Sequence, residues 1–123
     1  MLLLIDDSPE ITSIFEIIAT DLGVEYNISN SGTDGLRQFE KLRNQLKTVF
    51  VDFFLGDMNA DLFLEKLLET NADFIKQAEI KLVILTALPP DAELLQKASA
   101  KADCVEQKPT SLADFQKLIN KWS

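Results

Sequence analysis

The sequence predicts an α/β fold in which a parallel sheet of five strands is covered by helices on both faces. Short apolar segments alternate along the chain with amphipathic ones, as in βαβ units with right-handed crossovers. The apolar segments are almost continuous, as expected for strands buried on both faces. The chain has 123 residues, which suits one domain, and we find no linker, repeat or low-complexity segment. The predicted fold is therefore one doubly wound (βα)5 domain spanning residues 1–123.

The first half of the chain is predicted to hold three strands and three helices. The strands are expected at residues 2–5, at 24–28 and within 47–54. Ser8 can cap the first helix, Pro9 lies in its first turn, apolar residues follow at helical spacing, and Gly23 ends it. The next two helices are expected at residues 31 to about 46 and 60 to about 70.

The second half is predicted to add two strands and two helices. A strand is expected at residues 79–85, and "LPP" separates it from a helix at 91 to about 102. A short strand follows at 103–107. Ser111 can cap a last helix whose apolar face consists of Leu112, Phe115, Leu118, Ile119 and Trp122.

Composition excludes several classes of function. Twenty acidic residues against twelve basic ones give a net charge of −8, which disfavours binding to nucleic acid. The chain has no His, which excludes His-ligated zinc and Ser-His-Asp catalysis. The single Cys104 permits no intrachain disulfide and is expected to be a small core residue. No signal peptide or membrane-spanning segment is evident, so we expect a cytoplasmic protein that does not bind membranes.

Polar residues follow four of the five predicted strands. Asp6 and Asp7 follow the first strand, Asp52 ends the third, Thr86 ends the fourth, and Lys108 follows the fifth. The second strand is the exception, since it ends in "SNSG". In open α/β sheets, ligands bind at the carboxyl ends of the strands. These five residues are therefore expected to meet at one edge of the sheet.

Three carboxylates at one edge repel one another. Two unit charges roughly 4 Å apart cost on the order of 4 kcal/mol at an effective dielectric constant near 20. Carboxylate oxygens without His or Cys favour Mg²⁺, which also accepts backbone carbonyls, water and phosphate. A lysine and a hydroxyl group opposite would suit a phosphoryl group. The residues therefore predict a Mg²⁺-dependent phosphoryl site with an aspartate available as nucleophile.

Each of these residues also has a purely structural interpretation. Asp7 could cap the first helix, Asp52 could form a salt bridge with Lys108, and Thr86 is a common strand residue. Lys108 could be a solvated strand end. The functional interpretation depends on the coincidence of all of them at one edge.

Four motifs resemble the receiver domain of two-component response regulators. They are "IDDSPE", "VFVDFFLGDM", "VILTA" and "VEQKP", and their order and spacing match over essentially the whole chain. The resemblance is to a stand-alone, chemotaxis-regulator-like receiver, although a receiver excised from a hybrid kinase would look the same. It implies a flavodoxin-like strand order, 2-1-3-4-5.

The resemblance implies roles for the acidic residues. Asp52 would be the phosphoacceptor, taking a phosphoryl group from the phosphohistidine of a sensor histidine kinase or histidine phosphotransfer protein. Asp7 would bind Mg²⁺ directly, Asp6 mostly through water, and Asp52 and the backbone carbonyl of Phe54 would complete the protein ligands. The chain would act as a signalling switch that catalyses only its own phosphorylation and dephosphorylation, and not as a turnover enzyme.

The resemblance also implies roles on the opposite side of the site. Thr86 would move to hydrogen-bond the phosphoryl group, and the small Ala87 beside it would leave access to the phosphate. Lys108 would pair with a phosphoryl oxygen. The bond between Lys108 and Pro109 would be cis, as is typical of this family, and would aim the lysine.

The sequence departs from the family pattern at several positions. Val105 replaces the switch aromatic, Gly56 replaces a usual proline, and Ala60 replaces a common glycine. The valine has no ring to swing inward, so the route of signal transmission is open. Phe54 and Leu88 cannot orient an attacking water by hydrogen bonding, which predicts slow self-dephosphorylation.

The resemblance implies protein partners. A downstream protein would dock on the face made by the helix at 91–102, the strand at 103–107 and the last helix, and a homodimer is possible there.

The main alternative is a pseudo-receiver, a binding module that takes no phosphate. An FMN carrier is disfavoured by the acids of "DDSPE", and a dehalogenase-type phosphatase would need a second acid where Phe54 stands.

Overall fold

The computed structural model describes residues 1–123 and contains a parallel sheet of five strands in the order β2-β1-β3-β4-β5. The strands are β1 (Leu2–Ile5), β2 (Tyr26–Ser29), β3 (Thr48–Asp52), β4 (Lys81–Thr86) and β5 (Cys104–Gln107). Every neighbouring pair is parallel. The predicted fold class and strand order are confirmed.

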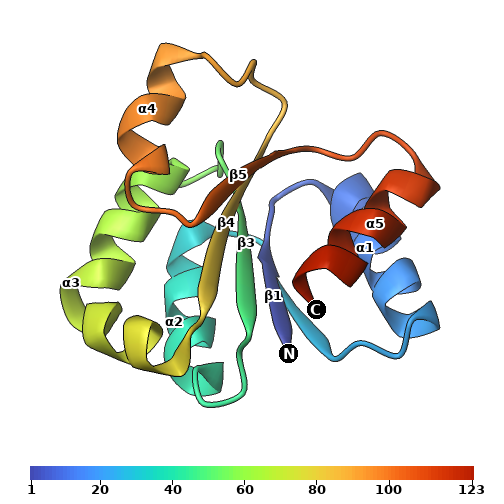
Figure 1. Cartoon of the computed structure of the whole chain (residues 1–123), viewed down its shortest axis with the longest axis horizontal. Helices are drawn as coiled ribbons and strands as arrows, with labels where there is room; N and C mark the ends of the chain where they lie inside the picture. Colours follow the sequence, from blue (N-terminus) through green and yellow to red (C-terminus); the bar gives the residue numbers. More distant parts are fainter.

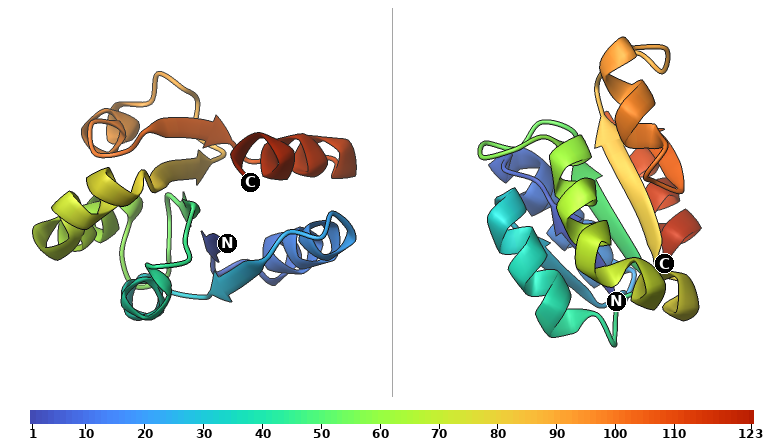
Figure 2. Two further views of the ribbon diagram at one scale, coloured as in Figure 1. Left: turned by 60° about the horizontal axis from the view of Figure 1, so that its bottom comes forward. Right: turned by 90° about the vertical axis from the view of Figure 1, so that its left-hand side faces the viewer.

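Five helices cover the two faces of this sheet (Figures 1 and 2). The helices are α1 (Pro9–Asp21), α2 (Gly32–Leu42), α3 (Ala60–Ala78), α4 (Glu93–Ser99) and α5 (Leu112–Trp122). Figure 1 shows α1 and α5 on one side of the sheet, and α2, α3 and α4 on the other. No helix is both long enough and apolar enough to span a membrane.

The strands divide their side chains between two hydrophobic cores because successive strand residues point to opposite faces. In β1, Leu3 and Ile5 belong to the core under α2, α3 and α4, whereas Leu2 and Leu4 belong to the core under α1 and α5. All four are buried, which explains the unbroken apolar run in the sequence. The same alternation occurs in β3 and β4.

Strand pairing continues just beyond the carboxyl ends of the strands and fixes the residues that follow them. The N–H of Asp6 donates to the carbonyl of Ser29 at 3.0 Å, and the N–H of Lys108 donates to the carbonyl of Thr86 at 2.9 Å. Because these residues still belong to the ladder, their side chains leave the sheet at defined positions.

Several helix ends agree with the sequence. The hydroxyls of Ser8, Ser31 and Ser111 each accept a hydrogen bond from a first-turn N–H of α1, α2 and α5. Gly23 follows α1 with φ of 69°, a left-handed conformation that glycine adopts without a steric cost. The predicted strand bounds differ from the observed ones by one or two residues.

The lengths of three helices were predicted wrongly. Helix α3 runs to Ala78 instead of ending near Thr70, because the polar Asn71 is buried in contact with α2. Its amide donates to Glu40 at 2.6 Å and accepts from Arg43 at 3.1 Å. Helices α2 and α4 are shorter than predicted, and the N-cap of α4, Ala92, forms no side-chain hydrogen bond.

Glu79 ends α3 in the left-handed region, with φ of 56° and ψ of 37°. Its N–H donates to the carbonyl of Lys76, and the N–H of Ile80 donates to that of Ile75. This pattern is a Schellman motif, which favours glycine at the left-handed position. Any residue with a Cβ is strained in this left-handed backbone conformation.

We predict that Glu79→Gly stabilises the protein by about 1 kcal/mol, because it relieves this strain at an exposed site. Chemical denaturation followed by circular dichroism measures the change. Ala72→Gly, at an exposed position inside the same helix, should instead destabilise by about 1 kcal/mol. Equal loss of stability in both variants would contradict the argument.

Candidate functional site

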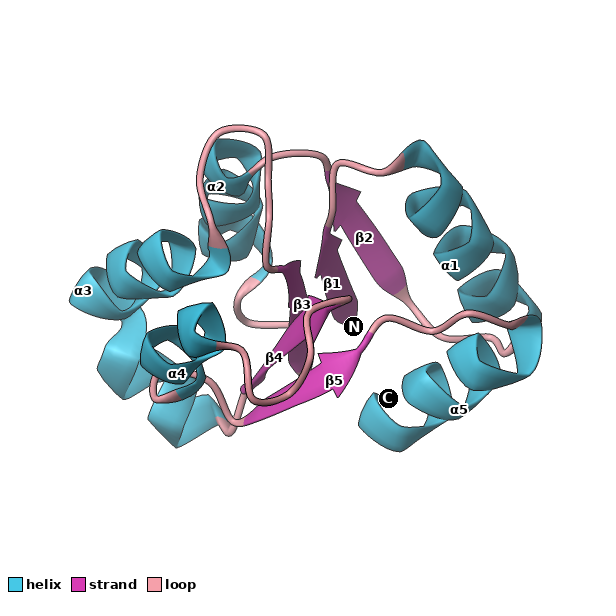
Figure 3. Cartoon of the chain, turned by 90° about the horizontal axis from the view of Figure 1, so that it is seen from above, coloured by secondary structure: helices cyan, strands magenta, loops and turns pink.

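The five residues singled out in the sequence lie together at the carboxyl edge of the sheet, the edge seen from above in Figure 3. Asp6 and Asp7 follow β1, Asp52 ends β3, Thr86 ends β4 and Lys108 follows β5. Asp6, Asp52 and Thr86 are buried, Lys108 is half-buried and Asp7 is exposed. The predicted convergence of these residues is present in the structure.

Asp6 has one oxygen in a local turn and one facing the site. Its Oδ1 accepts a hydrogen bond from the N–H of Ser8 at 2.9 Å, which helps to start α1. Its Oδ2 is fully buried and accepts no hydrogen bond. This oxygen lies 3.4 Å from the ammonium nitrogen of Lys108. A buried carboxylate oxygen with so little compensation is a ready partner for a cation.

Lys108 places its ammonium group between two carboxylates. Its Nζ lies 3.1 Å from Asp52 Oδ1, in addition to its contact with Asp6. Burial by itself would lower the pKa of Lys108, but the charges of Asp6 and Asp52 raise it above the ordinary value. The ammonium group is therefore charged at every physiological pH.

Asp52 combines burial with neighbouring negative charge. Burial is the larger cause and the charge of Asp6 the next, and together they raise the pKa of Asp52 to about 6. Lys108 acts in the opposite direction, and the charge of Asp7 adds a smaller rise. The carboxylate is mostly ionised at neutral pH, yet it is more basic and thus more nucleophilic than an exposed aspartate.

The three aspartates form an arrangement that fits a divalent metal. One oxygen from each of Asp6, Asp7 and Asp52 lies within 4.8 Å of the others. The donors are carboxylate oxygens only, the set preferred by Mg²⁺, and Oδ2 of Asp6 accepts no hydrogen bond. The residues present therefore fit the metal that the sequence predicts.

Thr86 ends the strand next to that of Asp52, and both residues line one hollow. Its Oγ accepts a hydrogen bond from the N–H of Leu88 at 3.0 Å, which leaves its own hydroxyl hydrogen free to donate. The carbonyl of Leu88 in turn accepts from the amide of Gln107 at 2.9 Å. A hollow of about 230 Å³ lies beside Asp52 and is lined by Asp52, Phe54, Thr86, Ala87, Leu88 and Lys108.

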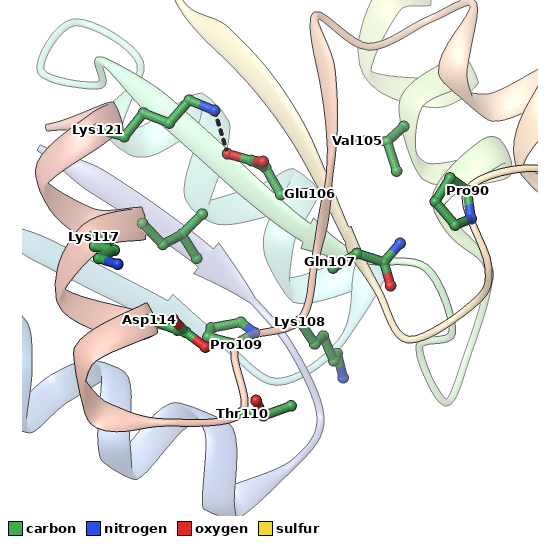
Figure 4. A pocket seen from close by; sticks show the side chains of 11 residues that line it. Pro90, Val105, Glu106, Gln107, Lys108, Pro109, Thr110, Asp114, Lys117 and Lys121 are labelled. Atoms are coloured by element: carbon green, nitrogen blue, oxygen red, sulfur yellow. Dashed lines mark ion pairs between the residues drawn. The ribbon is translucent and has the colours of Figure 1, made fainter.

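A larger hollow of about 700 Å³ lies along β5 and α5, and Asp52 does not line it (Figure 4). Val105 and Pro90 contribute to its wall, and Glu106 forms an ion pair of 3.0 Å with Lys121 at its edge. This hollow belongs to the surface at which the sequence predicts a protein partner.

One expectation about the site is wrong. The peptide bond between Lys108 and Pro109 is trans, as is every other peptide bond in the chain. The direction of the lysine follows instead from its backbone pairing with Thr86 and from the two carboxylates that its ammonium group contacts.

Sequence reasoning missed two residues near the site. Asp57 contacts the first residues of α2, and Gln107 holds the loop after β4. No sequence pattern marks either residue, because each forms its hydrogen bonds with backbone groups that are distant in the sequence. The turn formed by Asp6 was also missed, although an Asp that accepts from the N–H two residues further on is a known turn-forming pattern.

The fold is that of response regulator receiver domains. Neither the protein-family models nor the curated proteins give a sequence match. Among solved structures, the chain is similar to the chemotaxis response regulator CheY4 of Vibrio cholerae, with 20% identity, a TM-score of 0.82, and coverage of 99% of this chain and 97% of that one. It is also similar to a response regulator receiver domain protein from Clostridium thermocellum, with 22% identity, a TM-score of 0.74, and coverage of 98% and 90%.

A third similar structure is a CheX-CheY-BeF3-Mg complex from Borrelia burgdorferi, with 18% identity, a TM-score of 0.78, and coverage of 99% of this chain and 88% of that one. The resemblance predicted from the four sequence motifs is confirmed in the fold. At these identities the likeness concerns the fold, and the roles of individual residues are argued from the geometry of the site.

The raised pKa of Asp52 predicts a pH-dependent effect of Asp52→Asn on stability. The folded state holds this proton more tightly than the unfolded state, so stability is lost as the pH rises from 3.8 through about 6. Without added metal, the variant should be more stable than the wild type by about 2 kcal/mol at pH 7.5 and gain nothing at pH 3.5. Urea denaturation at both pH values tests this. A variant less stable than the wild type at pH 7.5 would contradict it.

Proposed function

We propose that residues 1–123 form a receiver domain that acts as a phosphoacceptor switch, with transfer of a phosphoryl group from a phosphohistidine to Asp52. The observation that carries the proposal is the position of Lys108. Its ammonium group contacts both Asp6 and Asp52, beside a hollow large enough for a phosphoryl group. A nucleophile, a fixed positive charge and a cluster of metal-binding oxygens therefore occur in one place.

In this proposal, a carboxylate oxygen of Asp52 attacks phosphorus and the bond from phosphorus to the histidine nitrogen breaks. The histidine nitrogen keeps the electron pair and later takes a proton from solvent. Lys108 pairs with a phosphoryl oxygen, and Thr86 donates its free hydroxyl hydrogen to another. Transfer of this kind depends mostly on position and electrostatics, which these buried groups supply.

Asp6, Asp7, Asp52 and the backbone carbonyl of Phe54 would hold Mg²⁺ in this proposal. When bound, the metal supplies positive charge that offsets the repulsion between the carboxylates and the incoming phosphoryl group. The protein catalyses only its own modification and its reversal, and does not turn over a substrate. Because the donor is a phosphorylated kinase or phosphotransfer protein, the proposed location is the cytoplasm.

The alternative function is a pseudo-receiver that binds a partner without taking phosphate. In that case Lys108 would be only the structural counterion of Asp6 and Asp52. The phosphoacceptor is favoured because one lysine leaves the third acid, Asp7, unpaired beside them, and because Asp52 faces an open hollow. A structural salt bridge needs neither feature.

Protein partners are proposed at two places. The donor would approach the hollow beside Asp52, and an output partner or a second copy would bind the face formed by α4, β5 and α5. The similar structures support protein partners in general, since they include a CheX-CheY complex and a beryllofluoride-activated NtrC4 receiver domain dimer. The hollow along β5 and α5 lies on this proposed face.

Acetyl phosphate tests the proposed chemistry without a kinase. We expect the intact mass to increase by one phosphoryl group when Mg²⁺ is present, and no increase with EDTA or in Asp52→Ala. Asp61→Ala is the control for loss of a partly buried acid outside the site and should be modified like the wild type. No modification of the wild type, together with no binding of beryllofluoride, would favour the pseudo-receiver.

The side chains around the hollow predict a long-lived aspartyl phosphate. Phe54 and Leu88 line it, and neither can hold a water molecule by hydrogen bonding. We expect Phe54→Gln to shorten the phosphoryl lifetime, because its amide can orient an attacking water. The decay of the phosphorylated mass after removal of acetyl phosphate measures both lifetimes. A wild-type half-life of a few seconds would contradict the prediction.

A further inference from the structure

The loop between β3 and α3, residues 53–59, passes beside the acidic cluster. A Cβ on Gly56 would lie 3.6 Å from Oδ2 of Asp7, so the backbone of this loop is close to that carboxylate. Phe54, whose carbonyl is a proposed metal ligand, belongs to the same loop. The position of this loop therefore affects the geometry of the proposed metal site.

This loop passes beside α2 (Figure 3). Asp57 fastens it to the start of that helix by hydrogen bonds. Its Oδ1 accepts from the N–H of Gly32 at 2.8 Å, and its Oδ2 accepts from the N–H and hydroxyl of Thr33 at 2.9 and 2.7 Å. These bonds lower the pKa of Asp57 to about 2, with the Thr33 N–H as the largest cause. The carboxylate is ionised at any physiological pH.

Asp57 supplies hydrogen-bond acceptors at this helix end. The first N–H groups of a helix have no partner within it. The hydroxyl of Ser31 accepts from the N–H of Asp34, and Asp57 accepts from the N–H groups of Gly32 and Thr33. The helix could obtain such bonds from water, so the contact does more for the loop than for the helix.

Packing next to Asp57 holds the loop at the same place. A Cβ on Gly32 would lie 2.5 Å from Cγ and Sδ of Met58, so the missing side chain allows Met58 to pack closely on α2. Within the loop, the N–H of Leu55 donates to the carbonyl of Met58 at 3.0 Å. Asp57 and Met58 therefore both contact the first turn of α2. Asp57 does so through charged hydrogen bonds and Met58 through close packing.

We propose that Asp57 is a positioning residue for the metal site: by fastening the loop to α2 it holds the Phe54 carbonyl and Gly56 where Mg²⁺ binding requires them. Asp57 itself is not a metal ligand in this proposal, since both its oxygens accept hydrogen bonds from α2. The inference rests on the proposed function, because it assumes that the acidic cluster binds Mg²⁺.

Calorimetric titration of the full chain with Mg²⁺ at pH 7.5 and 0.15 M salt tests this proposal. We expect Asp57→Ala to weaken Mg²⁺ binding by about ten-fold, a loss typical of residues that orient metal ligands. Thr33→Val removes one of the three hydrogen bonds and no charge. It should weaken binding less, in the same direction.

Two controls separate positioning from simpler causes. Asp61→Ala removes the same charge from the first turn of α3, where the carboxylate pairs with Lys101, and should change Mg²⁺ affinity by roughly two-fold or less. Ser31→Ala removes the side-chain cap of the same helix α2 without touching the loop, and should leave the affinity unchanged. Circular dichroism confirms that each variant is folded at the temperature of the titration.

The outcomes distinguish this inference from the proposed function. If the wild type binds Mg²⁺ and Asp57→Ala binds equally well, or Ser31→Ala is weakened as much, the positioning role is overturned and the proposed function stands. If the wild type does not bind Mg²⁺, the proposed metal site is overturned and this inference with it. Selective weakening in Asp57→Ala and Thr33→Val supports the positioning role.

Discussion

The ammonium group of Lys108 lies between the carboxylates of Asp6 and Asp52, and this contact decides what the carboxyl edge of the sheet can do. Two buried carboxylates would otherwise face each other across β1 and β3 with nothing to offset their charges. One lysine cannot neutralise two buried acids and the adjacent Asp7 as well. Burial, together with the remaining negative charge, raises the pKa of Asp52, and this charge makes the edge receptive to a cation.

This electrostatic arrangement depends on the way the sheet is built. The apolar residues of β1, β3 and β4 are buried on both faces of the sheet, so the polar side chains of these central strands lie at the strand ends. Backbone pairing extends one residue past β1 and past β5, which fixes the starting points of Asp6 and Lys108. The hydrophobic cores therefore supply rigidity, and the ends of the ladders supply the positions of the charges.

The sequence allowed the fold and the members of the site to be predicted because both depend on local signals. An apolar run followed by Asp6 and Asp7, or ended by Asp52, marks the end of a strand without reference to any other part of the chain. The extension of α3 could not be predicted, since the side chain of Asn71 forms hydrogen bonds with Glu40 of α2 and with Arg43 at the end of that helix. Likewise, the contacts of Asp57 with α2 join residues 24 and 25 positions apart.

With Val105 in β5, the connection between the site and this strand consists of hydrogen bonds. Valine offers only apolar contact and has no ring that could move between two positions. Two hydrogen bonds nevertheless join the site to β5, from the N–H of Leu88 to Thr86 Oγ and from the amide of Gln107 to the carbonyl of Leu88. The hydrogen-bonded connection from Thr86 to β5 in this chain therefore runs through the backbone of Leu88 and not through an aromatic side chain.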